Sequence, residues 1–287
     1  MAVYERTWRG YSGPLTPPRA RPWVLPRYAL AEAFSSRLFA AFYALTFVPT
    51  IVCAVMVYFH HNLDALALLG QQLADLVPID ARFFHIYMRV QALWLGIPLA
   101  VLLVPGPLCR DLAFGGLPLY LGRPLSRRGY LAGRAVVPLA LMSLSGWIPA
   151  FLIFLAQAWL AGGEWLRTHA RLALAIPVAG LAWAGLLVLL GLAAAALTGR
   201  RIPAQALLVG GLLAASAFGH ALSGMFHSPH GLMVSPLDGM QAVWQSLFGG
   251  KPENDLPAVE GLVPLAASAA LALRTLHRKV RPKEEVK

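Results

Sequence analysis

Long apolar runs alternate with short polar blocks along most of the chain. About 20 apolar residues in a helix cross a bilayer, and the sequence holds six runs that reach or approach this length. The predicted spans cover approximately residues 38–59, 86–108, 135–160, 172–198, 202–226 and 258–276. The sixth is the weakest, because Glu260 and Arg274 leave a short uncharged centre and must both reach toward the interface. The pattern predicts an all-α membrane protein with six transmembrane helices.

The two ends of the chain are polar. Residues 1–25 mix arginines with glycines, prolines and aromatic side chains, which is typical of an extended tail, and residues 277–287 form a basic tail. Before the first span, apolar residues recur at helical spacing and favour a short amphipathic helix over residues 26–37 at the membrane interface. This helix includes Arg27, Leu30, Phe34 and Arg37. A simple extension of the first span explains the same periodicity equally well.

Composition agrees with a membrane protein. The chain is 58% hydrophobic and 13% charged, with a mean hydropathy of +0.62. Soluble domains have about 45–50% apolar and about 25% charged residues, so one soluble core cannot hide this much apolar surface. The net charge of +11 comes from short basic blocks between apolar runs, which topology explains without nucleic acid as a partner. The two cysteines lie within or at the end of apolar runs, so no disulfide framework is indicated.

The basic residues also predict an orientation. Most of them lie in the N-terminal tail, in residues 109–134, at the turn around Arg200 and in the C-terminal tail. The opposite side of the six spans receives Arg82, Arg89, Arg167, Arg171 and Lys251. Because cytoplasmic loops carry the excess of lysine and arginine, both termini are predicted to be cytoplasmic. The expected location is a bacterial-type cytoplasmic (inner) membrane.

Candidate chemistry inside the membrane is sparse. A rhomboid-like serine protease needs a glycine two positions before its Ser-Gly pair, and Ser145 and Ser223 both lack it. Haem ligation needs paired histidines at one depth, whereas His220 is alone well inside a span. Arg89 lies about one turn inside the outer end of the second span. Arg89 and His220 are therefore candidates for a substrate or outer site, with a snorkelling arginine and a packing histidine as the alternatives. No metal site is predicted.

Residues 109–134 combine arginines with glycine and proline corners between two spans, so they are expected to lie outside the hydrocarbon. Their order resembles the loop between the second and third spans of ATP-binding-cassette (ABC) transporter permeases of the type-2 exporter class. The matching positions are Asp111, Gly115, Leu117, Pro118, Tyr120, Leu121, Arg123, Pro124, Ser126, Arg127, Tyr130, Gly133 and Arg134. The chain departs from the pattern at Arg134, where lysine is usual, and in an enlarged outer segment over residues 60–85.

The resemblance implies a type-2 ABC exporter-like fold, with the transmembrane pathway and the ATPase on separate subunits. Two permease subunits, identical or different, would pair in the bilayer, and a cytoplasmic ATPase dimer would drive them. The loop would dock on the ATPase with the helix over residues 26–37 beside it. ATP and Mg²⁺ would bind to the partner, since the chain lacks the Gly-x-x-x-x-Gly-Lys-Ser/Thr pattern and is not expected to be an enzyme by itself. The alternatives are arginines that only set topology, in a non-transporting scaffold or an intramembrane enzyme with an outer site.

Overall fold

The computed structural model describes residues 24–62, 78–116, 126–250 and 253–280, and these residues form helices joined by short turns. Six helical segments of the described chain are long and apolar enough to cross a membrane. They are Arg37–His61, Ala81–Ala113, Arg127–Ala161, Leu172–Thr198, Arg201–Phe226 and Ala258–Lys279. The structure thus confirms the six predicted spans, and the chain is a multi-pass membrane protein.

Several spans consist of more than one helix. The first span is α2 (Arg37–Leu45) and α3 (Val48–His61), and the third is α9 (Arg127–Ser145) and α10 (Trp147–Ala161). The second joins α5 (Ala81–Val90), the π-helical turn η3 (Gln91–Gly96), α6 (Ile97–Leu103) and α7 (Pro105–Ala113). The last three spans are α12 (Leu172–Thr198), α13 (Arg201–Phe226) and α15 (Ala258–Lys279). Shorter elements are α1 (Val24–Ser35), α11 (Gly163–His169), the 3₁₀ turn η4 (Pro229–Val234) and α14 (Pro236–Phe248).

The second and third helical segments are longer than the predicted spans over residues 86–108 and 135–160. The prediction ended each span at its flanking charges. The helices continue through them, because a helix keeps its own backbone hydrogen bonds and its end charges can reach polar surroundings. As a result α7 and α9 extend well into the segment that was expected to be a loop.

One buried glutamine connects the interruptions of three spans. Gln91 begins the π-helical turn and is only 4% exposed. Its Nε2 donates to the carbonyl oxygen of Thr46 at 2.9 Å, between α2 and α3, and to that of Ser145 at the end of α9. The Ser145 carbonyl would face the backbone nitrogen of Pro149 four residues later, and proline has no N–H to donate. The Gln91 amide therefore supplies the donor that this helix break lacks.

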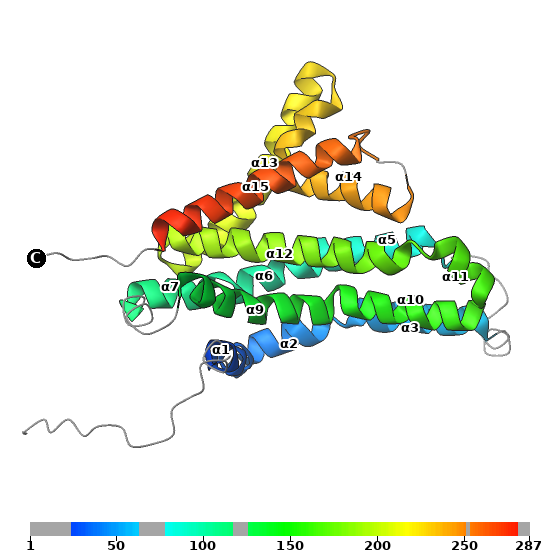
Figure 1. Cartoon of the computed structure of the whole chain (residues 1–287), viewed down its shortest axis with the longest axis horizontal. Coiled ribbons are helices and arrows are strands. Elements are labelled where there is room, and N and C mark those ends of the chain that lie inside the picture. The colour runs from blue at the N-terminus through cyan, green and yellow to red at the C-terminus, as the bar shows by residue number, and fades with distance from the viewer. Residues whose placement is uncertain (1–23, 63–77, 117–125, 251–252, 281–287) are drawn as a thin grey trace, which may run out of the picture.

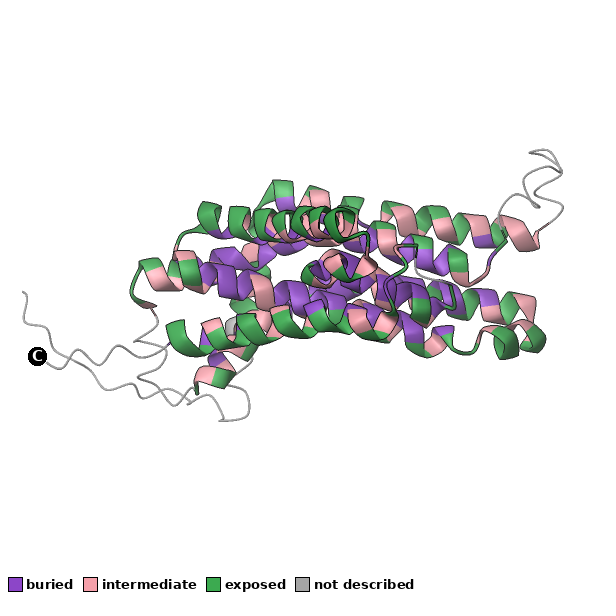
Figure 2. Cartoon of the chain, turned by 90° about the horizontal axis from the view of Figure 1, so that it is seen from above, coloured by how far each residue is buried: buried purple, intermediate pink, exposed green. Residues whose placement is uncertain are grey.

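Helix α12 occupies the centre of the bundle (Figure 1), where it packs against α7, α9, α10, α13, α14 and α15. Glycines permit two of its closest approaches. A β-carbon at Gly180 would lie 2.3 Å from the Trp147 β-carbon, and one at Gly191 would lie 2.7 Å from Val104 Cγ1. Figure 2 shows buried residues along the middle of the bundle and exposed residues on its outer faces. The core of the protein thus follows α12.

The N-terminal helix α1 lies across the long axis of the bundle and is seen end-on in Figure 1. Ser36 is extended and caps α2 by accepting a hydrogen bond from the Phe39 amide at 3.3 Å. Arg37 therefore belongs to the first span and not to the helix predicted over residues 26–37, because the cap separates the two helices. Arg27 is exposed, as are Leu30 at 43% and Phe34 at 42%.

Candidate functional site

A polar cluster that is largely shielded from solvent joins the second span to the third. Asp111 lies near the end of α7, and Tyr130 and Arg134 lie one turn apart on α9. The Tyr130 hydroxyl and Arg134 Nη2 both donate to Asp111 Oδ2. The side chains of Asp111 and Arg134 are 12% and 9% exposed, and Tyr130 is fully buried. We call these residues the Asp111 cluster; it fixes the two helices that flank residues 117–125.

The local sequence explains how the cluster forms. Ser126 caps α9 by accepting a hydrogen bond from the Gly129 amide at 3.1 Å, which sets where the helix begins. The i, i+4 spacing of Tyr130 and Arg134 places them on one helix face. Beyond α7, Gly115 has a positive φ of 64°, a conformation that glycine adopts without steric cost. Capping at one end and a glycine turn at the other leave Asp111 opposite the two donors.

The predicted loop residues have different positions in the structure. Asp111, Tyr130 and Arg134 come together, and Gly133, which lies between Tyr130 and Arg134 in sequence, is buried. Arg127 Nη1 donates to the His277 carbonyl at 3.4 Å and so contacts the end of α15. Pro118, Tyr120, Arg123 and Pro124 lie outside the described residues, as do Leu117 and Leu121. The described part of the motif therefore forms the base of the loop.

An ion pair that the sequence did not reveal attaches α1 to this region. Glu32 on α1 pairs with Arg110 on α7, next to Asp111. Helix α1 also packs along α9, where Ala29 and Ala33 are partly buried. Because the Glu32 and Arg110 side chains are 37% and 53% exposed, their pair positions α1 more than it stabilises the fold. No local pattern connects residues so far apart in sequence, so this contact had no sequence signal.

His220 has a partner that was also missed. Asp238 on α14 accepts a hydrogen bond from Ser216 Oγ at 3.1 Å, and its Oδ1 lies 3.3 Å from His220 Nε2. Ser216 and His220 share one face of α13 at i, i+4 spacing. Ser235, three residues before Asp238, caps α14 and is a sequence signal for the start of that helix, but it gives no signal for the contact with His220. The aspartate lies between serine and histidine, whereas a hydrolytic triad needs the histidine in the middle, so this arrangement does not activate a serine nucleophile.

Arg89, the other candidate for an outer site, pairs with Glu253 at 3.2 Å. Other contacts hold the segment between α13 and α15 in place. His230 Nδ1 lies 2.8 Å from Glu260 Oε2, and Arg171 donates to the carbonyls of Ser246 at 2.8 Å and Leu247 at 3.1 Å. Arg89 thus has a protein partner across this surface. In the described parts of the chain, no group of three or more histidine, cysteine, aspartate or glutamate side chains could hold a metal ion.

No protein-family model matches this sequence, and no curated protein matches it. The similarity to type-2 ABC permeases therefore rests on the residues of the loop themselves. Three of those residues, Asp111, Tyr130 and Arg134, contact one another in the structure. This contact is a geometric property of the motif that the sequence alone did not supply.

Proposed function

We propose that the chain is the transmembrane permease subunit of an ABC transporter, an exporter driven by a separate ATPase subunit at the cytoplasmic membrane. The Asp111 cluster is the observation that carries this proposal. It joins the ends of α7 and α9, the two helices on either side of residues 117–125, through an ion pair and a hydrogen bond. A force applied at this end of the two helices would therefore move them together, because packed helices move as rigid bodies.

A path from the Asp111 cluster to the far half of the bundle supports this role. Helices α7 and α9 both pack on α12, and α12 packs on α14 and α15. Helix α14 is in turn attached to α13 through Asp238, Ser216 and His220. A tilt of α7 and α9 would therefore reach α14 through direct helix contacts, as a coupling mechanism requires.

The surface of the chain fits a subunit of a larger membrane assembly. The first, fifth and sixth spans bury few of their side chains, in contrast to α12. Ile51, Leu213 and Leu271 are examples of large apolar side chains exposed on them. Lipid and a second permease subunit, identical or homologous, would cover these faces. The substrate class that suits such apolar walls is hydrophobic or amphipathic.

Photo-crosslinking tests the contact with an ATPase. A photoreactive amino acid at position 123 lies in the proposed docking segment, and one at Trp159 is the control, because this residue is 83% exposed near the opposite end of the third span. Irradiated membranes of the native host should give a covalent adduct between position 123 and an ABC ATPase, with none from position 159. If position 123 gives no ATPase adduct, or both positions give the same adducts, the proposal fails.

A further inference from the structure

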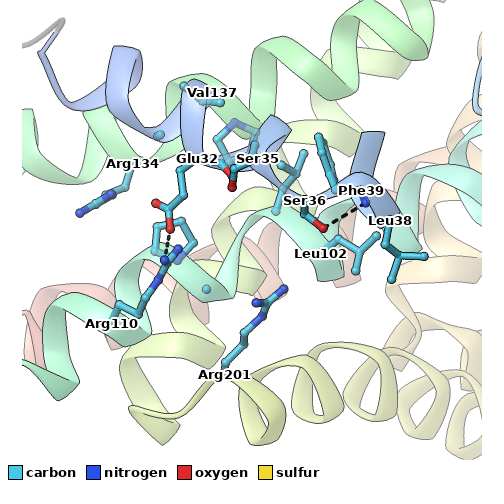
Figure 3. Close-up of a pocket in the computed structure, with 16 residues that line it drawn as sticks. Glu32, Ser35, Ser36, Leu38, Phe39, Leu102, Arg110, Arg134, Val137 and Arg201 are labelled. Carbon is cyan, nitrogen blue, oxygen red and sulfur yellow. Dashed lines mark hydrogen bonds and ion pairs between the residues drawn. The ribbon is translucent and has the colours of Figure 1, made fainter. Parts of the chain in front are cut away.

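A cavity of about 250 Å³ opens where α1 and α2 meet α6, α7, α9 and the first turn of α13 (Figure 3). Four charged residues line it, and they come from four different helices: Glu32, Arg110, Arg134 and Arg201. Leucines on α2 and α6 complete one side of the wall. The cavity is thus basic on one side and apolar on the other.

The charges that line the cavity do not cancel. Arg110 is paired with Glu32, and Arg134 with Asp111. Arg201 is an exposed residue with no hydrogen bond or ion pair to any residue in the described part of the chain, and Figure 3 shows its guanidinium between the side chains of Arg110 and Leu102. One positive charge is therefore left uncompensated beside the cavity.

The Arg201 side chain lies against the backbone of α7. A β-carbon built at Gly106 would lie 3.6 Å from Arg201 Nε, an ordinary contact distance, so the two residues are neighbours in the cavity wall. Ser36 adds a hydroxyl to the same wall; its Oγ accepts the Phe39 amide and keeps its own hydrogen for another acceptor. Both groups are hydrogen-bond donors that suit an oxyanion.

Part of the cavity wall is apolar and exposed. Leu38, in the first turn of the first span, is 75% exposed, and Leu102 on α6 lies beside it in the wall. The cavity is smaller than the pockets of about 300–1,000 Å³ that enclose drug-sized ligands. This volume suits a small polar group, and apolar chains attached to such a group would lie outside the cavity along the leucines.

We propose that this cavity binds the phosphate of an anionic phospholipid in the leaflet on the α1 side of the protein. A phosphodiester carries a single negative charge and could serve as the anionic partner of Arg201. The planar guanidinium suits phosphate oxygens. Basic cavities between transmembrane helices are a recurring way to hold anionic head groups. The site contacts α1, α7 and α9 together, so a bound lipid would stabilise the position of α1 against the base of the loop.

Lipid binding by the purified full chain tests the proposal and does not depend on any ATPase. Intact-complex mass spectrometry in uncharged detergent would measure the apparent Kd of phosphatidylglycerol, phosphatidylcholine and inorganic phosphate. We expect Arg201→Ala to raise the apparent Kd for phosphatidylglycerol about fivefold or more, because this is the effect of one arginine near an anionic lipid. Arg200→Ala is the matched control, because this exposed neighbour does not line the cavity, and it should leave the Kd unchanged.

Two further measurements make the outcome decisive. Arg201→Lys keeps the charge and should retain part of the affinity, which also provides a folded variant if the alanine substitution perturbs the protein. Inorganic phosphate alone should bind far more weakly than the lipid, because it lacks the chains that contact Leu38. Equal affinities of wild type and both Arg201 variants, or equal losses in Arg200→Ala and Arg201→Ala, would overturn the site. Phosphate that binds as tightly as the lipid would show a soluble anion to be the ligand.

Discussion

Removing one charge of the Asp111 cluster should destabilise the protein strongly. Asp111 and Arg134 are 12% and 9% exposed, so water screens their interaction little. Asp111→Ala removes the carboxylate that pairs with the Arg134 guanidinium, and loss of one partner of a buried pair costs about 3–5 kcal/mol. The same substitution also removes the acceptor of the Tyr130 hydroxyl. We therefore expect a loss in the upper part of this range.

The double variant Asp111→Ala/Arg134→Ala separates the interaction energy of the pair from the contacts that each side chain makes with other residues. With both charges gone no buried charge stays unpaired, so the double variant should be more stable than the sum of the single losses predicts, by about 0.5–3 kcal/mol. Arg128→Ala is the control, because Arg128 is exposed on the same helix and should change stability by no more than about 0.5 kcal/mol.

The assay is reversible unfolding in mixed micelles, with a denaturing detergent titrated in and helicity followed by circular dichroism. The free energies of unfolding of wild type, the two single variants Asp111→Ala and Arg134→Ala, and the double variant give the coupling between Asp111 and Arg134 directly. Arg128→Ala is measured beside them as the control. Two results would refute the reasoning: a loss in Asp111→Ala no larger than in Arg128→Ala, or single losses that add exactly in the double variant. Either would mean that the pair does not hold α7 to α9.

Three other substitutions, the first of them with a control variant, test tertiary contacts. Gly180→Ala places a β-carbon 2.3 Å from that of Trp147 and should lower the free energy of unfolding by about 1–3 kcal/mol in the same assay. Gly185→Ala is the control, because there is open space around this residue, and it should be neutral or slightly stabilising. Equal effects of the two substitutions would contradict the close approach of α12 and Trp147. Gln91→Leu removes the donor to two carbonyls at helix breaks and should cost about 1–3 kcal/mol in thermal unfolding; an unchanged transition would disprove its role. Arg171→Ala removes the hydrogen bonds at the end of α14 and should speed hydrogen exchange there; exchange that is unchanged at this end, or faster throughout the chain, would argue against that contact.

The spans could be predicted from the sequence because bilayer thickness limits the choices. The fourth and fifth predicted spans, over residues 172–198 and 202–226, match α12 and α13 closely, since each lies between clear polar turns. The ends of the second and third were underestimated, because charged residues such as Arg110 and Asp111 continue a helix without interrupting its backbone hydrogen bonds. Length and polarity alone do not contain this information.

The contacts of the candidate site could not be predicted from the sequence. The loop motif named Asp111, Tyr130 and Arg134, but nothing in their spacing showed that the three side chains meet. Glu32–Arg110 and His220–Asp238 are likewise tertiary contacts between distant segments. A periodic pattern reports which face of a helix is apolar, whereas the choice of partner depends on how the helices pack.

ATP turnover by the complex extracted in its native lipids is the measurement that tests the coupling proposal most directly. The chain, tagged in its native host, should co-purify with an ABC ATPase, and the complex should hydrolyse ATP. Arg123→Ala combined with Arg127→Ala should lower turnover several-fold, or release the ATPase, while the permease stays folded. Purification of this chain without any ATPase, or turnover that is unchanged in the double variant, would contradict the account.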